Sequence, residues 1–379
     1  MTPFSIATPP RILFGRGEAA RAPALIRAFG PSGIVVHGAD ASRAAGLVDA
    51  LRATGVTVTT LSCPTEPTLA LIEAALVTAR TTDAQWVAAL GGGAALDMGK
   101  ALAALIPAPG PILDHLEVVG AGLPLRADPL PFIAMPTTAG TGAEVTKNAV
   151  IGLPDHGRKV SLRDDRMIAR LAIVDPALTD GCPRAVTLAS GLDALAQVIE
   201  PFVSLRANPY TDALTRPAIA LALPALQVLM TGEDAQARDT MAWVSLCGGL
   251  ALANSGLGAV HGLAGPIGGV SPAAHGAICG ALLGPVLAMN RHRATGPAAD
   301  KLAYVCAVLA TALACTPDAA PGALSDWIRQ AGLPGLTAQG LDPGLHRSVA
   351  TAALEASSMK GNPVALSHPD LLHLLTEAS

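Results

Sequence analysis

The sequence is poor in aromatic residues, in charge and in paired cysteines, and each scarcity argues against a class of protein. Among its 379 residues, 3% are aromatic, 14% are charged and 51% are hydrophobic. So few rings argue against a stacking platform for single-stranded nucleic acid. So many apolar residues exclude a disordered chain. The formal net charge of -4 gives no electrostatic reason to bind nucleic acid or an anionic membrane.

Six cysteines stand far apart, at positions 63, 182, 247, 279, 306 and 315, and none forms a CxxC pair. We interpret them as reduced, and we expect a cytoplasmic protein. The first residues, MTPFSIATPPRILFG, lack the basic start and apolar core of a signal peptide. The uncharged segment 241–260 has the length of a membrane span, but its glycines dilute its apolarity, and we expect a buried helix there. Because few charges are available to cover the surface, we also expect a homo-oligomer.

The distribution of apolar stretches predicts two domains. Strand-like runs at 34–37, 56–61, 86–90 and 131–135 alternate with helical segments, and this pattern favours a doubly wound parallel sheet. One of these helices is expected from about Thr68 to Arg80, with Thr68 as its N-cap. After Pro183, alanine- and leucine-rich segments predict an all-α domain. We therefore expect an α/β N-terminal domain over 1–180 and a helical domain over 181–379.

Two glycine-containing loops follow predicted strands. GGGAALDMGK, residues 91–100, places three glycines between a strand and a helix, where free N–H groups can bind a phosphate. A tight turn with no ligand explains the triplet equally well. PTTAGTGAE, residues 136–144, ends another strand. Because ligands of open α/β sheets bind beyond the carboxyl ends of the strands, the two loops together favour a nucleotide site over two plain turns.

Polar residues in the second half lie in apolar surroundings. Asp193 and Gln197 share one helix face, with Glu200 nearby, and a buried carboxylate needs a partner. His261 and His275 are fourteen residues apart, and we expect Gly/Pro-rich turns between them. A lone histidine in such a place is usually a core residue. Two histidines and a buried aspartate form a candidate metal site, although spacing alone does not prove that they converge.

Taken together, these motifs resemble a known family. GGGAALDMGK, PTTAGTGAE, RKVSL, AIVDPALT, GLDALAQVIEPFVS and GAVHGLAGPIGG…HG occur in the order and spacing of the iron-containing alcohol dehydrogenases, which share the fold of dehydroquinate synthase. The resemblance covers almost the whole chain. It implies a Rossmann-like N-terminal domain, a helical metal and substrate domain, and an active site in the cleft between them. It also implies an NAD(P)-dependent oxidoreductase that interconverts an alcohol and an aldehyde or ketone by hydride transfer.

The resemblance also implies which residues act. The cofactor would be bound by Gly38, Gly91, Gly92, Gly93, Ala94, Asp97, Thr137, Thr138, Thr141 and Lys159. A divalent metal, iron or zinc, would be held by Asp193, Gln197, His261 and His275, of which Asp193 and His275 are also catalytic. The family normally has histidine at the position of Gln197, and commonly a proton-relay histidine at that of Gly265.

These two departures leave alternatives open. Glutamine is a poorer ligand than imidazole for Zn²⁺ or Fe²⁺. The chain is therefore either a metal-assisted dehydrogenase or a metal-independent carbonyl reductase resembling the maleylacetate reductases. A non-redox relative, as dehydroquinate synthase is, is a third class. Without a histidine at 265, proton transfer would use water, a ribose hydroxyl, another side chain, or His275 where no metal is bound.

The choice between NAD and NADP depends on the end of the second predicted strand. Gly38 leaves room for a 2′-phosphate, and Arg43 could pair with it. Asp40 could instead accept hydrogen bonds from the ribose hydroxyls of NAD. We expect the use of both cofactors, with a small or aliphatic alcohol or carbonyl compound as substrate.

Overall fold

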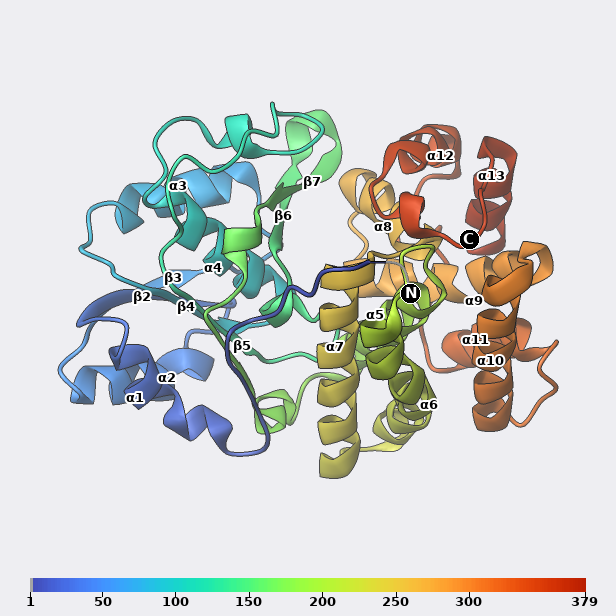
Figure 1. Ribbon diagram of the computed structural model, residues 1–379, viewed down its shortest axis with the longest axis horizontal. Coiled ribbons are helices and arrows are strands. Elements are labelled where there is room, and N and C mark those ends of the chain that lie inside the picture. Colours follow the sequence, from blue (N-terminus) through green and yellow to red (C-terminus); the bar gives the residue numbers. More distant parts are fainter. Residues whose placement is uncertain (1–2) are drawn as a thin grey trace. The chain divides into compact units, whose positions relative to one another are not determined.

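A computed structural model describes residues 3–379, and the chain divides into two compact units. One unit comprises Ala7–Thr138 and Ala143–Asp180. The other contains Gly181–Ser379, the short segment Ala139–Gly142 and the residues up to Ile6. Figure 1 shows the strands in the first unit, in blue to green, and the helices that make up the second, in yellow-green to red. The fold class expected from the sequence is confirmed.

The first unit is built on a six-stranded parallel sheet with the order β1-β8-β5-β4-β2-β3. Its strands are β1 (Ile12–Phe14), β2 (Ser32–His37), β3 (Thr57–Ser62), β4 (Val87–Gly91), β5 (Phe132–Pro136) and β8 (Leu171–Val174). The central strands are short runs of β-branched and small apolar residues. Such runs are typical of parallel strands that are buried on both faces.

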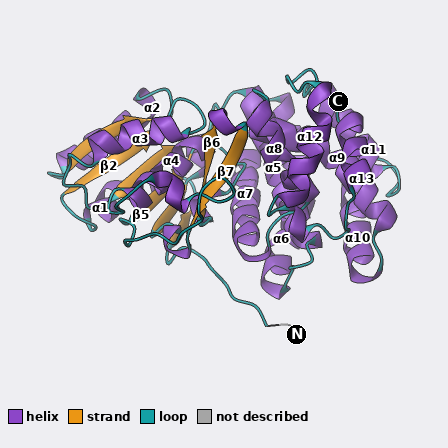
Figure 2. Cartoon of the chain, turned by 90° about the horizontal axis from the view of Figure 1, so that it is seen from above, coloured by secondary structure: helices purple, strands orange, loops and turns teal. Residues whose placement is uncertain are grey.

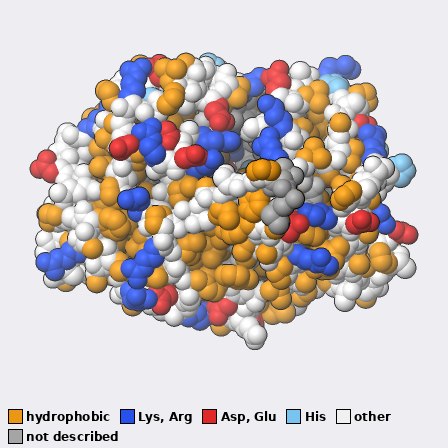
Figure 3. Space-filling view, viewed as in Figure 1, with side chains coloured by type: hydrophobic (Ala, Val, Ile, Leu, Met, Phe, Trp, Pro, Cys, Tyr) orange, Lys and Arg blue, Asp and Glu red, His pale blue; other side chains and the backbone are white. Residues whose placement is uncertain are grey.

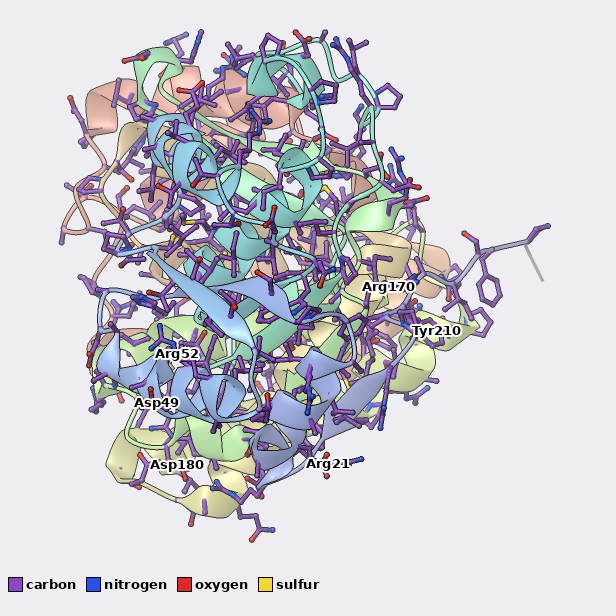
Figure 4. The ribbon with its side chains drawn as sticks, turned by 90° about the vertical axis from the view of Figure 1, so that its left-hand side faces the viewer. Arg21, Asp49, Arg52, Arg170, Asp180 and Tyr210 are labelled. Carbon is purple, nitrogen blue, oxygen red and sulfur yellow. The ribbon has the colours of Figure 1, made fainter. Side chains whose placement is uncertain are left out.

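Helices cover both faces of this sheet, as Figure 2 shows. On one face, α1 (Ala22–Arg27) and α2 (Ser42–Ala53) pack on alternate strand residues such as Val35 and Ile173. On the other, α3 (Leu69–Ala79) and α4 (Gly93–Leu105) pack on Ile34 and Val36. Figure 4 shows Asp49 and Arg52 on α2, both of them exposed. Successive strand residues therefore contribute to two separate cores.

The start of α3 agrees with the sequence-based expectation. Thr68 is its N-cap, and the Thr68 side chain accepts a hydrogen bond from the backbone N–H of Leu71. This bond satisfies one of the amide groups that a helix leaves free at its first turn. An antiparallel hairpin, β6 (Asn148–Leu153) and β7 (Arg158–Arg163), forms a second small sheet in the same unit.

The second unit is all-helical in its described residues, apart from its connections. Its helices are α5 (Arg184–Val203), α6 (Pro209–Thr231), α7 (Ala235–Ser255), α8 (Ala259–Val270), α9 (His275–Arg293), α10 (Gly296–Leu313), α11 (Ala320–Gln330), α12 (His346–Glu355) and α13 (His368–Glu377). A single apolar core joins them, drawn mainly from alanine, leucine and valine side chains. This core explains why the second half reads as long apolar segments with few charges.

One expectation about this unit is wrong. The segment between His261 and His275 is not a series of turns, because most of it is helix α8, with Gly262 and Pro266 inside it. Propensity disfavours glycine and proline in helices, but packing overrides it here. The Cβ of any larger residue at 262 would lie 2.8 Å from the Met359 side chain, so the glycine permits close packing of α8.

Three helices are long and apolar enough, by length and composition alone, to cross a membrane: α5, α6 and α10. Of their apolar windows, 83%, 44% and 28% are buried within the protein. The segment singled out from the sequence, 241–260, does not form one straight helix. Helix α7 ends at Ser255, and the chain then turns by 96° into α8. Figure 3 shows charged side chains, singly and in small groups, among hydrophobic ones on one face of the surface.

We predict that Gly33→Ala destabilises the α/β unit. The new Cβ would lie 2.2 Å from the ring of Trp86, which is fully buried in the core beneath β2. Overpacking of this kind costs about 1–3 kcal/mol. Chemical denaturation followed by circular dichroism measures the change.

Gly46→Ala is the matched control, because Gly46 is an exposed residue of α2 with nothing within 4 Å of its added Cβ. Alanine is the better helix former, so this variant should be more stable by up to ~1 kcal/mol. Equal stabilities of the two variants would contradict the packing described for β2.

Candidate active site

The glycine turn after β4 lies at the point where the strand order of the sheet reverses. The chain runs from β2 outward to β3 and returns to β4 on the other side of β2. Open α/β sheets bind ligands beyond the carboxyl ends of the strands at such a switch point. Here those ends are Gly38 and Gly91, and a Cβ on Gly91 would lie 3.5 Å from the backbone nitrogen of Gly38.

The second predicted loop lies against this turn. The backbone N–H of Thr137 donates to the carbonyl of Gly91 over 2.9 Å. The side chain of Thr138 lies beside Gly92, 3.4 Å from where its Cβ would stand. Gly92 is the N-cap of α4 and provides no side-chain cap, so the first amide groups of that helix have no partner from the cap. Glycine and threonine thus surround a free helix N-terminus.

Asp97 and Lys100 form a buried pair that holds the β6–β7 hairpin against α4. The Lys100 ammonium lies 3.2 Å from the Asp97 carboxylate and donates to the Thr146 hydroxyl and to the carbonyl of Asn148. Asp97 in turn accepts from the backbone N–H of Val150. Burial raises the pKa of Asp97 and lowers that of Lys100, while the attraction between the two groups opposes both shifts.

The structure brings most of the predicted cofactor residues together. Gly38, Gly91, Gly92, Gly93, Ala94, Thr137 and Thr138 lie at or directly beyond the ends of β2, β4 and β5. Asp97 lies within α4, where it contacts the hairpin, and Lys159 lies on β7, where it forms an ion pair with Glu66. Thr141 lies in the segment that belongs to the helical unit. The role of each in cofactor binding stays a prediction.

A cluster of metal-ligating side chains forms within the helical unit. Asp193 comes from α5, His261 from α8, and His275 and Cys279 from the first turns of α9. One ligand atom from each lies within 4.8 Å of all the others. The Asp193 carboxylate is 3.1 Å from His261 Nε2 and 3.9 Å from His275 Nε2. The structure thus brings Asp193, His261 and His275 together, as the resemblance to the family implied.

His261 is held between two carboxylates. Its Nε2 faces Asp193, and its Nδ1 lies 2.6 Å from Glu200 Oε2. The other oxygen of Glu200 accepts from the backbone N–H of Val260, in the first turn of α8. All three side chains are less than 10% exposed. A buried imidazole between two carboxyl groups is satisfied by a proton on both nitrogens, by a protonated carboxyl group that donates to one nitrogen, or by a cation between one nitrogen and its carboxylate.

The pKa values of the cluster indicate surroundings that favour positive charge. Burial alone would raise the pKa of Asp193, but the two facing imidazoles hold it below its usual range. Burial alone would lower the pKa of His275, yet the neighbouring Cys279 and Asp193 raise it to about 9. The pKa of His261 is raised as well, against the effect of its burial, by Cys279 and Glu200. A site of this kind stabilises a cation.

Two residues of this site were missed or undervalued in the sequence. Cys279 was interpreted as a buried hydrophobe, although its spacing of four from His275 on a helix is the signal that joins them. Glu200 was placed nearby, without its role of orienting His261. The expected ligand Gln197 is buried, and its amide nitrogen donates to the Gly140 carbonyl over 3.1 Å. Its role as a metal ligand stays a prediction.

Comparison with known proteins identifies the family. The iron-containing alcohol dehydrogenase family matches residues 9–176, and its C-terminal counterpart, the Fe-containing alcohol dehydrogenase family, matches residues 187–379. The chain belongs to the iron-containing alcohol dehydrogenase family, as the motifs indicated. This is a family of soluble oxidoreductases for which NAD(P) and a divalent metal are typical.

Individual relatives show how the family varies. The chain is 40% identical to long-chain-alcohol dehydrogenase 1 of Geobacillus thermodenitrificans over 236 residues, 62% of this chain but only 59% of that enzyme. It is 30% identical to the 4-hydroxybutyrate dehydrogenase of Cupriavidus necator over 324 residues, 83% of each chain. The structure of sulfoacetaldehyde reductase from Bifidobacterium kashiwanohense, in complex with NAD⁺, superimposes with a TM-score of 0.85 at 26% identity, covering 99–100% of both chains.

We predict that Gly92→Val weakens cofactor binding at least tenfold, which corresponds to about 1.4 kcal/mol. The branched side chain would occupy the space before the N-terminus of α4 that a pyrophosphate needs. Fluorescence titration with NADH and NADPH measures the effect. Gly92→Ala adds only a methyl group at ordinary contact distance from Thr138, so its loss should be smaller. Unchanged affinity in a folded Gly92→Val protein would remove the pyrophosphate from this turn.

Proposed function

We propose that this protein is an NAD(P)-dependent alcohol dehydrogenase or aldehyde reductase that uses a divalent metal. One observation carries the proposal: Asp193, His261 and His275 form a cluster whose ligand atoms converge to within 4.8 Å of one another. Family membership and the glycine turn at the switch point of the sheet supply the cofactor half of the chemistry.

The residues present suit a metal ion. Carboxylate oxygen and imidazole nitrogen are ligands for Zn²⁺ and Fe²⁺, and Asp193, His261 and His275 would hold it. When bound, such a cation stabilises the alkoxide of an alcohol and polarises the carbonyl group in the reverse direction. Glu200 accepts a hydrogen bond from His261 Nδ1 and so keeps Nε2 directed at the site. His275 is the most accessible member, with 34% of its side chain exposed.

The hydride moves between the carbinol carbon of the substrate and the nicotinamide ring. The alcohol also loses its hydroxyl proton, and position 265 does not supply a relay, because it is a glycine facing open space. We propose that this proton leaves through water or a ribose hydroxyl. The protein contributes orientation and electrostatics, while the cofactor supplies the redox chemistry.

We propose that both NAD and NADP are used. A Cβ on Gly38 would meet nothing within 4 Å, so the end of β2 leaves room for a 2′-phosphate. Asp40 already accepts from the backbone and hydroxyl of Ser42, and this makes it a weaker acceptor for ribose. Arg43 is exposed in the first turn of α2, where it can pair with a phosphate.

The substrate class that we propose is an aliphatic primary alcohol or its aldehyde. The named relatives act on long-chain alcohols, on 4-hydroxybutyrate and on sulfoacetaldehyde, all of which are aliphatic. We further propose that the protein works in the cytoplasm as a homo-oligomer. Sedimentation at micromolar concentration tests the oligomer, and a monomer would contradict it.

A metal-independent carbonyl reductase is the second candidate, and Gln197 at the position of a usual ligand favours it. The two candidates differ in what Asp193→Ala does. With a metal, the variant loses a direct ligand, so metal affinity and turnover should each fall by at least the roughly 10–100-fold that follows the loss of an outer-shell partner. Without a metal, activity changes while the metal content stays as in the wild type.

The test combines elemental analysis of protein purified without chelator with an NAD(P)H assay. The panel contains long-chain aldehydes, succinic semialdehyde and sulfoacetaldehyde. Asp49→Ala is the control, because Asp49 is exposed on α2 and belongs to the other unit. No turnover of any carbonyl compound with either cofactor, with or without added metal, would overturn the proposed function.

A further inference from the structure

The fourth member of the metal cluster is not a residue that the family pattern supplies. We propose that the thiolate of Cys279 is the fourth protein ligand of the metal ion, and that Gln197 is not a ligand. This proposal rests on the proposed function only in that the cluster holds a divalent cation. It gives the site a donor set of one carboxylate, two imidazoles and one thiolate.

The geometry supports a ligand role for Cys279. It lies one helical turn after His275 on α9, so the two side chains project from the same face. Its sulfur is 3.7 Å from His275 Nε2 and within 4.8 Å of the ligand atoms of Asp193 and His261. Donor atoms ~2.0–2.3 Å from a tetrahedral ion lie roughly 3.3–3.8 Å from one another. Three of the distances between donor atoms of this cluster, 3.1, 3.7 and 3.9 Å, lie in or close to that range, and all of the donor atoms lie within 4.8 Å of one another.

Gln197 has a different task in the structure. Its amide nitrogen donates to the Gly140 carbonyl, in the segment Ala139–Gly142 that belongs to the helical unit. In the same segment Gly142 has a φ of +58°, and a Cβ there would lie 2.5 Å from the backbone of Gly249. Gln197 therefore helps to hold this segment, which packs closely on α7. In this proposal Cys279 on α9 supplies the ligand that the family's usual histidine supplies at position 197 on α5.

The thiolate changes the charge and the preference of the site. When the metal binds, the Sγ–H bond breaks, the proton leaves to solvent and a sulfur–metal bond forms. Asp193 and Cys279 then carry two negative charges, which neutralise a divalent cation. One aspartate and three histidines would leave one positive charge. Because thiolate is a soft ligand, we expect this site to select Zn²⁺ over Fe²⁺.

Cobalt substitution tests the proposal without any assay of activity. The full-length apoprotein is titrated with Co²⁺, and the wild type should develop the near-ultraviolet charge-transfer absorption of a cobalt–thiolate bond. Cys279→Ser should lose this band and bind Co²⁺ and Zn²⁺ at least tenfold more weakly. Competition between Zn²⁺ and Fe²⁺ under reducing, anaerobic conditions should load the wild type with zinc.

Two controls keep the result specific. Cys306→Ser removes another buried cysteine of the helical unit, on α10, and should keep both the band and the affinity. Gln197→Ala should also keep the band, because Cys279 still provides its sulfur. The wild-type protein must itself show the band. Absence of the band from the wild type therefore contradicts the proposal even if the Cys279→Ser variant does not fold.

The outcomes separate this inference from the proposed function. A cobalt–thiolate band in a protein that turns over no carbonyl compound supports Cys279 and rejects the dehydrogenase. Metal-dependent turnover without the band, or with an unchanged band in Cys279→Ser, rejects Cys279 and keeps the dehydrogenase. Loss of metal in Gln197→Ala together with its retention in Cys279→Ser would assign the fourth position to Gln197.

Discussion

The site depends on one buried imidazole that is fixed between two carboxylates. Asp193 and Glu200 stand two turns apart on α5, and His261 from α8 fits between them. Three groups of this kind are costly to bury unless their charges are balanced. The path of the chain makes this contact possible, because α7 ends at Ser255 and the 96° turn into α8 brings His261 to α5.

A second constraint lies in the α/β unit, where backbone rather than side chains defines the site. Gly38, Gly91 and Gly92 stand at the ends of neighbouring strands, and the Thr137 amide joins the two loops. Small residues let the main chain approach a phosphate, and the free start of α4 provides its amides. The site in the helical unit is formed by side chains instead, because the backbone N–H and C=O groups there are hydrogen-bonded within the helices.

Most of the fold and part of the candidate site could be predicted from the sequence, and particular residues explain why. The alternation of short apolar runs and helices predicts the sheet, and Thr68 predicts where α3 begins, since both signals are local. Asp193, His261 and His275 are separated by long stretches, so their convergence needed the resemblance to a family. Helix α8 was mistaken for turns because its glycines and Pro266 disfavour helix locally, while packing against α9 and α12 decides the outcome. Cys279 was overlooked because its residue type is common in cores.

The buried pair of Asp97 and Lys100 has a consequence for how this chain can change over evolutionary time. The Lys100 side chain is fully buried and the Asp97 side chain is 15% exposed, and the ammonium also links α4 to β6 through Thr146 and Asn148. Loss of either partner alone would strand a charge in the interior, at a cost of about 3–5 kcal/mol, whereas joint replacement by apolar residues is far milder. Sequences that descend from this one should therefore keep both residues or replace both. A redesign of the hairpin should likewise change Asp97 and Lys100 together.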